Sequence, residues 1–303
     1  KMAISRAQLA KELEPGLNAL FGLEFGRYEN EHSEIYEEES SDRAFEEEVM
    51  LGGFATAPVK SEGGAISFDD AQETYTARYT HETIALAFSI TEEAIEDNLY
   101  DRLASRYTKA LARSMATTKQ IKAASILNNA FLTGANVIGD GAALCSASHP
   151  SLSGTQTNLL AVAADLNETS LEQMLIDIAG FTDERGLKIA VRGTKLIIPK
   201  ELQFIAERVM NSALRSGTSD NDNNAMKNMG MLPEGAVVNH YLTDTDAYFI
   251  KTDAPNGFKY FNRAAIKTAM EGDFDTGNMR FKARERYSFG VSDWRCVFGT
   301  PGA

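Results

Sequence analysis

The stretch Thr91–Phe131 reads TEEAIEDNLYDRLASRYTKALARSMATTKQIKAASILNNAF. Thr91 can cap the N-terminus of a helix, and Glu92 and Glu93 suit the positive end of its dipole. Apolar side chains then recur at helical spacing, at Ile95, Leu99, Leu103, Tyr107, Leu111, Met115 and later Ile121. Because no Pro or Gly interrupts residues 92–131, the pattern predicts one helix about 60 Å long, at roughly 1.5 Å per residue.

The predicted helix is apolar along one stripe only. Its remaining surface carries the cations Arg102, Arg106, Lys109, Arg113, Lys119 and Lys122. We therefore expect the helix to pack one face on a sheet and to expose the other. A helix of this length is unusual in a compact enzyme core and is typical of proteins built around a spine.

The chain before this helix begins with a short helix and an acidic segment. Residues Ser5–Leu13 favour a helix that Pro15 and Gly16 end. Residues 29–48 hold ten acidic side chains against one cation, Arg43. This segment is either a solvated arm or loop, or an arm that lies along a basic surface of a neighbouring subunit.

Between the acidic segment and the long helix, the sequence predicts a loop and then a strand. The pairs Gly52-Gly53 and Gly63-Gly64 bracket residues 54–62, which is typical of a flexible loop or hairpin tip. Residues 74–91 alternate aromatic and β-branched side chains with polar ones, which predicts one long strand. Its second half, Ile84–Ile90, is expected to be the more buried part.

Residues 169–252 favour a compact α/β lobe. Thr169-x-x-Glu172 resembles a capping box, and the helix that it starts is expected to stop at Gly186. Lys195–Ile198 has the pattern of a buried strand, and Pro199 starts a helix through Asn211. Two further strands are expected at Ala236–Leu242 and Ala247–Thr252, as a hairpin around residues 243–246.

The last strand predicted is strongly amphipathic. One parity holds the largely apolar set Met279, Phe281, Ala283, Glu285, Tyr287, Phe289 and Val291, and the other holds Arg280, Lys282, Arg284 and Arg286. The first face can bury, whereas the second forms a row of four cations. The row is either a solvent-facing surface or a docking surface for an acidic segment of another subunit.

The composition is that of a globular chain. Of its 303 residues, 43% are hydrophobic and 24% are charged. No run approaches the roughly 20 apolar residues that span a bilayer, and the N-terminus lacks the apolar core of a signal peptide. Cys145 and Cys296 cannot form a disulfide framework and suit a reducing compartment, so we expect a cytoplasmic product. The net charge of -13 gives no global footprint for nucleic acid, but is compatible with a shell that encloses DNA without trapping it.

Motifs for metal binding or catalysis are incomplete. The four histidines, His32, His81, His149 and His240, stand in no zinc-protease frame. Residues 220–224 begin like a calcium-binding loop, but Ala225 replaces the turn glycine. No phosphate loop, dinucleotide fingerprint or nucleophile elbow is present. We expect no enzymatic activity, cofactor, metal or catalytic residue, although abundant carboxylates leave a hydrolase pair open.

From the residues alone, the chain is a two-lobed α+β protein with a long spine helix, an acidic arm and a glycine-flanked hairpin. This order resembles the Johnson-type fold of tailed-phage major capsid proteins, and more specifically the Mu-like prophage major head subunit family. The resembling stretches cover nearly the whole chain: Arg78–His81, Ile90–Glu93, Glu96–Tyr100, Cys145–Leu159, Ile178–Gly186, Lys195–Phe204, Asn224–Leu242, Tyr248–Ile250 and Phe281–Asp293. None of them is a chemical motif, and the match rests on their order and spacing.

The resemblance implies a division of the chain and a structural function. It implies an N-terminal arm at 1–51, an extended loop at 52–79 that lies over a neighbour, a peripheral domain at 80–168 with the spine helix at 92–131, an axial domain at 169–252, and a return to the peripheral domain at 253–303. It implies self-assembly through pentamers and hexamers into an icosahedral shell that encloses the double-stranded DNA of a tailed phage. The subunit is then made in the host bacterial cytoplasm and located in the virion.

The resemblance also implies partners and contact residues. Because the sequence enters the arm almost directly, we expect a separate scaffold protein, together with portal and possible decoration proteins, DNA without sequence-specific binding, and no membrane. Some relatives crosslink a Lys to an Asn of another subunit; Lys60 lies in the extended loop, but no partner Asn or catalysing Glu is evident. The candidate subunit-interface residues are Glu37, Glu38, Glu39, Lys60, Arg280, Lys282, Arg284 and Arg286.

Three other functions remain open. An encapsulin-like nanocompartment shell would share the fold but hold cargo enzymes. A metal-independent hydrolase would need a convergent polar pocket, to which the sequence does not point. A tail or baseplate component is disfavoured only through the family resemblance.

Overall fold

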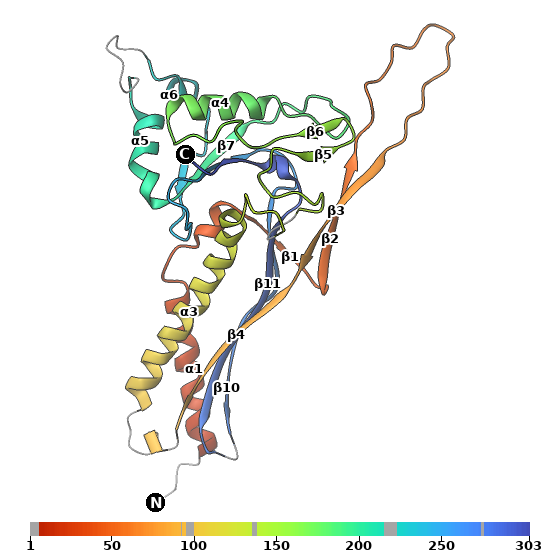
Figure 1. Ribbon diagram of the computed structural model, residues 1–303. Helices are drawn as coiled ribbons and strands as arrows, with labels where there is room; N and C mark the ends of the chain where they lie inside the picture. The colour runs from red at the N-terminus through yellow and green to blue at the C-terminus, as the bar shows by residue number, and fades with distance from the viewer. Residues whose placement is uncertain (1–5, 92, 95–99, 135–137, 215–222, 274–275) are drawn as a thin grey trace, which may run out of the picture.

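The computed structural model describes residues 6–91, 93–94, 100–134, 138–214, 223–273 and 276–303. The molecule is elongated: a helical and β-sheet stalk carries a rounded lobe at one end, and a two-stranded ribbon projects beside the lobe (Figure 1).

The stalk consists of two helices on one face of a four-stranded sheet. The sheet has the order β1 (Glu37–Ser40), β10 (Phe258–Gly272), β11 (Met279–Val291) and β4 (Glu82–Ile90). Strand β1 runs parallel to β10, and the other neighbours are antiparallel. Helices α1 (Arg6–Phe25) and α3 (Tyr100–Asn128) pack together and against this sheet.

Helix α3 confirms the predicted spine helix, with differences in its ends and its buried stripe. It ends at Asn128 instead of residue 131, and expected helical residues 92 and 95–99 lie outside the described residues. Leu111 and Met115 are buried as predicted, but Tyr107 and Ile121 are about half exposed, at 48% and 52%. Small residues such as Ala112 take their place on the buried face, because the sheet and α1 approach α3 closely.

The prediction that Pro15 and Gly16 end the first helix is wrong. Helix α1 continues through Pro15 to Phe25. Its second half buries Leu17 and Phe21 against the sheet residue Phe281, in a cluster that α3 completes. This apolar packing outweighs the local cost of a proline inside a helix.

The acidic segment is folded into the subunit and is not a solvated loop. It forms a short 3-10 turn, Glu31–Glu34, then strand β1, then strand β2 (Phe45–Gly52). Buried Ile35 and Tyr36 tie it to the core, and the Tyr36 hydroxyl donates a 2.8 Å hydrogen bond to the carbonyl of Ala123 on α3. Local charge alone did not reveal this, because β1 pairs with β10, more than 200 residues away, and β2 pairs with β3 across the ribbon loop.

The strand predicted at 74–91 is two strands in different sheets. Strand β3 (Gln72–Thr80) pairs with β2 in the projecting ribbon, whereas β4 pairs with β11 in the stalk. The change of partner occurs at His81, whose ring nitrogens lie 2.9 Å from the hydroxyls of Ser41 and Ser288. The expected burial of Ile84–Ile90 is also only partial, because Ala85, Leu86 and Ala87 are exposed.

The lobe is built on a second four-stranded sheet. Its order is β12 (Val297–Thr300), β9 (Tyr248–Thr252), β7 (Gly193–Ile198) and β8 (Ala236–Val238). It is accompanied by helices α4 (Glu168–Ala179), α5 (Gln203–Asn211) and α6 (Ala225–Met229), a 3-10 turn at Lys200–Leu202, and the small hairpin of β5 (His149–Ser151) and β6 (Gly154–Gln156). The predicted strand at 195–198 and helix after Pro199 are confirmed.

Three local predictions in the lobe are wrong. The N-cap of α4 is Asn167 with Ser170 as its capping-box partner, not Thr169 with Glu172, and the helix stops at Ala179 instead of Gly186. Strands β8 and β9 do not form a hairpin, because β7 lies between them. In addition, β12 joins the lobe sheet through β9, although residues 253–303 were all expected to return to the stalk.

One large apolar core joins the lobe to the adjacent end of the stalk. Its fully buried members include Tyr248 and Phe249 on β9, Trp294 in the short 3-10 turn Trp294–Cys296, and Phe298 on β12. A second cluster lies between α1, α3 and the far end of the stalk sheet. The two parts are therefore supported by continuous packing where they meet.

Candidate assembly surfaces

The β2–β3 ribbon ends in a long loop, residues 53–71, whose apolar side chains have few neighbours in the subunit. Val59 is 99% and Phe68 95% exposed, and Ile66 and Phe54 are also exposed. Isolated exposed apolar side chains are ordinary, but four on one projecting loop indicate an interaction surface. Beyond its base, the loop stands clear of the lobe and the stalk (Figure 1).

Polar contacts fix the base of this loop to the lobe through Asp69 and Asp70. Arg185 donates a 2.7 Å hydrogen bond to the carbonyl of Asp70 and lies 3.8 Å from the Asp69 carboxylate. That carboxylate also accepts a 2.8 Å hydrogen bond from the Ala55 N–H. The pKa of Asp69 is lowered, mainly because this hydrogen bond stabilises the ionised carboxylate. The loop is thus presented from a defined base.

A buried charge network fixes the ribbon to the stalk. The Lys259 ammonium on β10 pairs with Glu48 on β2 and, at 3.0 Å, with Glu39 on β1. Burial by itself lowers the pKa of Lys259, but the hydrogen bonds from these carboxylates raise it above its ordinary value. Ser292 donates to Glu48 and shares a hydrogen bond with Tyr79 on β3. Both strands of the ribbon are therefore anchored.

Lys60 lies in the exposed part of the ribbon loop, beside Val59. Lys60 is the one cation within residues 53–71, and Glu62, Asp69 and Asp70 are the anions. The loop therefore has a net charge of -2. The loop therefore combines apolar side chains with a modest acidic excess.

The cations predicted on one parity of β11 form a row on the open face of the stalk sheet. Arg280, Lys282 and Arg284 are exposed and Arg286 is half-buried, while the opposite parity packs inward, as predicted. Successive members are about 6.8 Å apart along an antiparallel strand. We call these four residues the cation row. Arg280 is 2.5 Å from Asp273.

Small side chains flank the cation row on the β4 side, where the register places Ser89, Ala87, Ala85 and Thr83. On the β10 side, Ala264 and Ala269 alternate with Lys267, opposite Arg284, and Glu271, opposite Arg280. A hollow of about 360 Å³ opens there, lined by residues that include Ala87, Ala269, Arg280 and Lys282. Because both helices cover the other face of the sheet, a partner can reach the row.

The structure does not bring the acidic triplet Glu37, Glu38 and Glu39 to the cation row of the same subunit. The triplet lies on β1, and β10 separates β1 from β11. Glu39 pairs with Lys259, and Glu38 accepts a 3.2 Å hydrogen bond from the Asn262 side chain. Glu37 and Glu38 remain exposed.

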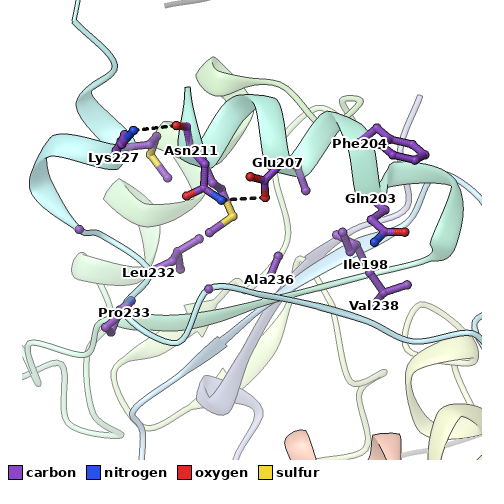
Figure 2. A pocket seen from close by; sticks show the side chains of 15 residues that line it. Ile198, Gln203, Phe204, Glu207, Asn211, Lys227, Leu232, Pro233, Ala236 and Val238 are labelled. Carbon is purple, nitrogen blue, oxygen red and sulfur yellow. Dashed lines mark hydrogen bonds between the residues drawn. The ribbon is translucent and has the colours of Figure 1, made fainter. Parts of the chain in front are cut away.

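The lobe has a groove that the sequence did not reveal. It measures about 600 Å³ and lies between α5, α6 and the edge strand β8 (Figure 2). Met210, Met226 and Leu232 contribute apolar surface, and Phe204 at one end is 75% exposed. The groove forms between segments that meet only in the folded lobe, so no local pattern could have indicated it.

The histidines occupy packing positions and surface pairs. His149 is fully buried, stacks on Trp294 at 4.5 Å and lies 2.7 Å from Asp140. Burial lowers the pKa of His32 and of His81. Among the described residues, no cluster of three His, Cys, Asp or Glu side chains is arranged to hold a metal ion. In the same part of the chain, no helix combines the length and the apolar character needed to cross a membrane.

Comparison with known proteins identifies a family and a fold. A model of the family described as phage capsid protein matches residues 74–299. The virus-like particle from Pyrococcus furiosus has a similar structure, with TM-score 0.53 and 10% identity over 94% of this chain and 97% of that chain. The capsid of Myoviridae phage XM1 gives 0.51 and 11% over 89% of both chains. The procapsid of bacteriophage JBD30 gives 0.51 and 15% over 98% of this chain and 76% of that chain. These likenesses confirm the predicted α+β, Johnson-type fold; no curated protein matches by sequence.

Proposed function

The chain belongs to the phage capsid protein family, and from this we propose that it is the major head subunit of a tailed phage. Its role is structural. In this proposal many copies form pentamers and hexamers, which close into an icosahedral shell around double-stranded DNA. Contacts between different patches on neighbouring copies close into rings and a curved lattice, and many modest interfaces together stabilise the shell.

The observation that carries the proposal is the projecting ribbon loop with its exposed apolar side chains. Val59 and Phe68 have almost no neighbours in their own subunit, although the base of the loop is firmly anchored. A neighbouring copy that covers them would remove apolar surface from water, which favours association. The family match supports a phage shell over the nanocompartment alternative.

The finer features of the proposal follow the same family. We keep the division into arm, extended loop, peripheral domain and axial domain, with β12 as a strand shared with the axial sheet. The interface includes Glu37, Glu38 and Lys60 together with the cation row, and Glu39 acts mainly within the subunit through Lys259. The Mu-like head subunits are the proposed subfamily. Scaffold, portal and decoration proteins are the proposed partners, the DNA is enclosed without sequence-specific contacts, and the subunit is made in the host bacterial cytoplasm and resides in the virion.

Negative-stain electron microscopy with light-scattering chromatography tests the proposal. The purified chain, alone and co-produced with its scaffold, should give closed shells or rings of five or six copies. Val59→Asp with Phe68→Asp should abolish them while leaving the circular dichroism spectrum unchanged. The matched control is Val162→Asp, at an 80% exposed position on the lobe. A wild-type chain that stays monomeric across concentrations, salts and both preparations would contradict the proposed function.

A further inference from the structure

His81 lies at the joint where the ribbon leaves the stalk. It is the residue between β3, which ends at Thr80 in the ribbon, and β4, which begins at Glu82 in the stalk sheet (Figure 1). The ribbon pair Phe45 with Thr80 is adjacent to it. The His81 side chain is 5% exposed, so its polar atoms depend on partners within the subunit. A change at this ring therefore acts directly on the junction between the ribbon and the stalk.

Both nitrogens of the His81 ring are hydrogen-bonded, each to a different part of the subunit. Nε2 lies 2.9 Å from the Ser41 hydroxyl, and Nδ1 lies 2.9 Å from the hydroxyl of Ser288 on β11. Ser41 in turn donates a 2.7 Å hydrogen bond to the carboxylate of Glu46 on β2. One continuous chain of hydrogen bonds thus runs from the stalk sheet through His81 to the first strand of the ribbon.

The neutral ring fits this chain in one tautomer. Because the Ser41 hydroxyl gives its proton to Glu46, its oxygen accepts from His81, which places the ring proton on Nε2. Nδ1 then carries the lone pair and accepts from the Ser288 hydroxyl. A second proton, on Nδ1, would meet the proton of Ser288, so this hydroxyl must turn and give up the hydrogen bond that it donates.

The charges around His81 oppose its protonation. The neighbouring cations are Arg263 of β10 and Arg286 of β11, and the neighbouring anion is Glu46 of β2. Glu46 is shared, because its carboxylate also lies 4.0 Å from Arg43. Burial lowers the pKa of His81 below its ordinary value of 6.5, and the two arginines lower it further, while Glu46 acts in the opposite direction. A charged ring at this position is therefore both buried and close to cations.

We propose that His81 is an acid-sensitive joint between the ribbon and the stalk. When the ring takes up a second proton, the link from Ser288 through His81 to Ser41 opens and the base of the ribbon loosens. In the loosened state the ring reaches solvent, where it holds the proton more readily than in the closed joint. The closed joint is therefore fully stable above about pH 6.5 and is lost as the pH falls through its own lowered pKa.

The opening is local, and it affects the surface that the ribbon carries. The Lys259–Glu48 pair and the bond from Arg185 to Asp70 do not involve His81, so they hold the rest of the ribbon in place. Acid therefore changes the angle and the order of the ribbon at its base. Because the ribbon carries the exposed loop 53–71, the joint controls how that loop is presented.

Hydrogen exchange of the purified subunit tests the joint, when it is measured by mass spectrometry and corrected for the effect of pH on intrinsic exchange. In the wild type, protection of the amides at residues 41–47 and 79–83 should fall by about tenfold or more between about pH 7.5 and 4.5. Protection of β9 in the lobe should not fall with it, which separates local opening from acid unfolding. Constant protection at the joint over this range would overturn the proposal.

The variant His81→Gln separates the proton from the hydrogen bonds. A glutamine amide donates and accepts as the neutral ring does but does not titrate, so the joint should stay closed over the whole range. The matched control is His240→Gln, at an exposed histidine that pairs with Glu31, and it should open as the wild type does. A loss of protection in His81→Gln equal to that of the wild type would contradict the role of this ring.

Two charge variants keep the proposal testable if His81→Gln does not fold. Arg286→Gln removes a cation beside the ring, so opening should begin at a higher pH, whereas Glu46→Gln removes the anion, so opening should need a lower pH. Opposite displacements of the midpoint identify His81 as the titrating group, because a purely structural weakening would displace both midpoints in the same direction. Midpoints that stay fixed or move together would contradict the proposal. All measurements use the free subunit, so their outcome does not depend on the proposed shell function.

Discussion

The ammonium of Lys119 on α3 lies 2.7 Å from the Glu285 carboxylate on β11, in the interior of the stalk. The Glu285 side chain is 2% exposed, and the ammonium also lies 5.2 Å from the centre of the Tyr287 ring. Burial raises the pKa of Glu285, although Lys119 acts in the opposite direction. This pair fixes the spine helix on the face of the sheet opposite the cation row.

Removing the cation from this pair should strongly destabilise the subunit. Lys119→Met leaves Glu285 buried without a counter-charge, and we expect a loss of about 3–5 kcal/mol in the free energy of unfolding. The double variant Lys119→Met, Glu285→Leu should recover most of it, because no charge remains buried. Urea denaturation measures both.

The matched control is Lys122→Met, on the next turn of the helix. Lys122 pairs with Glu82 at the surface, with both side chains more than a third exposed. Its replacement should cost less than about 1 kcal/mol. If Lys119→Met and Lys122→Met lower the free energy of unfolding equally, the buried Lys119–Glu285 pair stabilises the subunit no more than a surface pair does.

Glu184 should make the stability of the subunit depend on pH. Its side chain is 3% exposed and lies 2.9 Å from Arg295, and burial raises its pKa above the ordinary carboxyl value of 4.5 in spite of this arginine. Above pH 4.5 the folded state therefore holds a proton that the unfolded state has lost. The free energy of unfolding should fall as pH rises from 4.5 through the raised value, by the linkage relation.

The variant Glu184→Gln should remove this component of the pH dependence. Urea denaturation at a series of pH values between 4 and 8 then gives a flatter profile than the wild type. Glu207→Gln, at an exposed position on α5, is the control and should follow the wild-type profile. A Glu184→Gln profile as steep as that of the wild type would contradict the assignment.

Arg185 should control the order of the ribbon loop without affecting the core. Arg185→Ala removes the hydrogen bond to the Asp70 carbonyl and the ion pair with Asp69. We expect proteolytic cleavage within residues 53–71 to become several-fold faster, while the free energy of unfolding changes by less than about 1 kcal/mol. The control is Lys188→Ala. The Lys188 ammonium donates a hydrogen bond to the Gly180 carbonyl and not to the loop, so this variant should leave loop cleavage unchanged.

Charge reversal in the cation row should impair assembly and spare folding. Arg284→Glu with Arg286→Glu places two anions where an acidic partner segment is expected, so shell yield should fall steeply while the subunit keeps its circular dichroism spectrum. Wild-type assembly through this surface should also weaken with added salt, because salt screens exposed charges. Electron microscopy and light scattering measure the yield.

The control variant changes the net charge of the subunit by the same amount as Arg284→Glu with Arg286→Glu, but on the lobe. Arg192→Glu with Lys200→Glu alters two exposed cations of the lobe. This variant should assemble more efficiently than Arg284→Glu with Arg286→Glu. Normal shell yield from the cation-row variant would remove the row from the interface.

Much of the fold was predictable because its signal is local. The alternation in Met279–Val291 determined both faces of β11, including the cation row and the buried position of Glu285. Helical spacing predicted α3 and α5, and glycine pairs marked the loop at the ribbon tip. Periodicity works in these cases because each element buries one face, whatever its partner is.

The candidate surfaces were predictable only in part. The sequence identified the cations of the row and placed Lys60 in the exposed loop. It missed the exposed middle of β4, because a run of apolar residues normally indicates burial and the exposure of Leu86 depends on how far α3 extends over the sheet. It also missed the groove beside Phe204, which requires α5, α6 and β8 to meet.

The sequence by itself determined the elements whose signal is periodic, namely α3, α5, β7 and β11, and the apolar face of β11. Only the tertiary structure decided the partners: β1 beside β10, β7 between β8 and β9, β12 in the lobe sheet, and α1 continuing past Pro15. The physical reason is that local preferences amount to fractions of a kcal/mol per residue, whereas burial of Leu17 or Tyr36 is worth about 1.5–3 kcal/mol each. Burial depends on residues distant in the chain, and their position is known only once the whole subunit has folded.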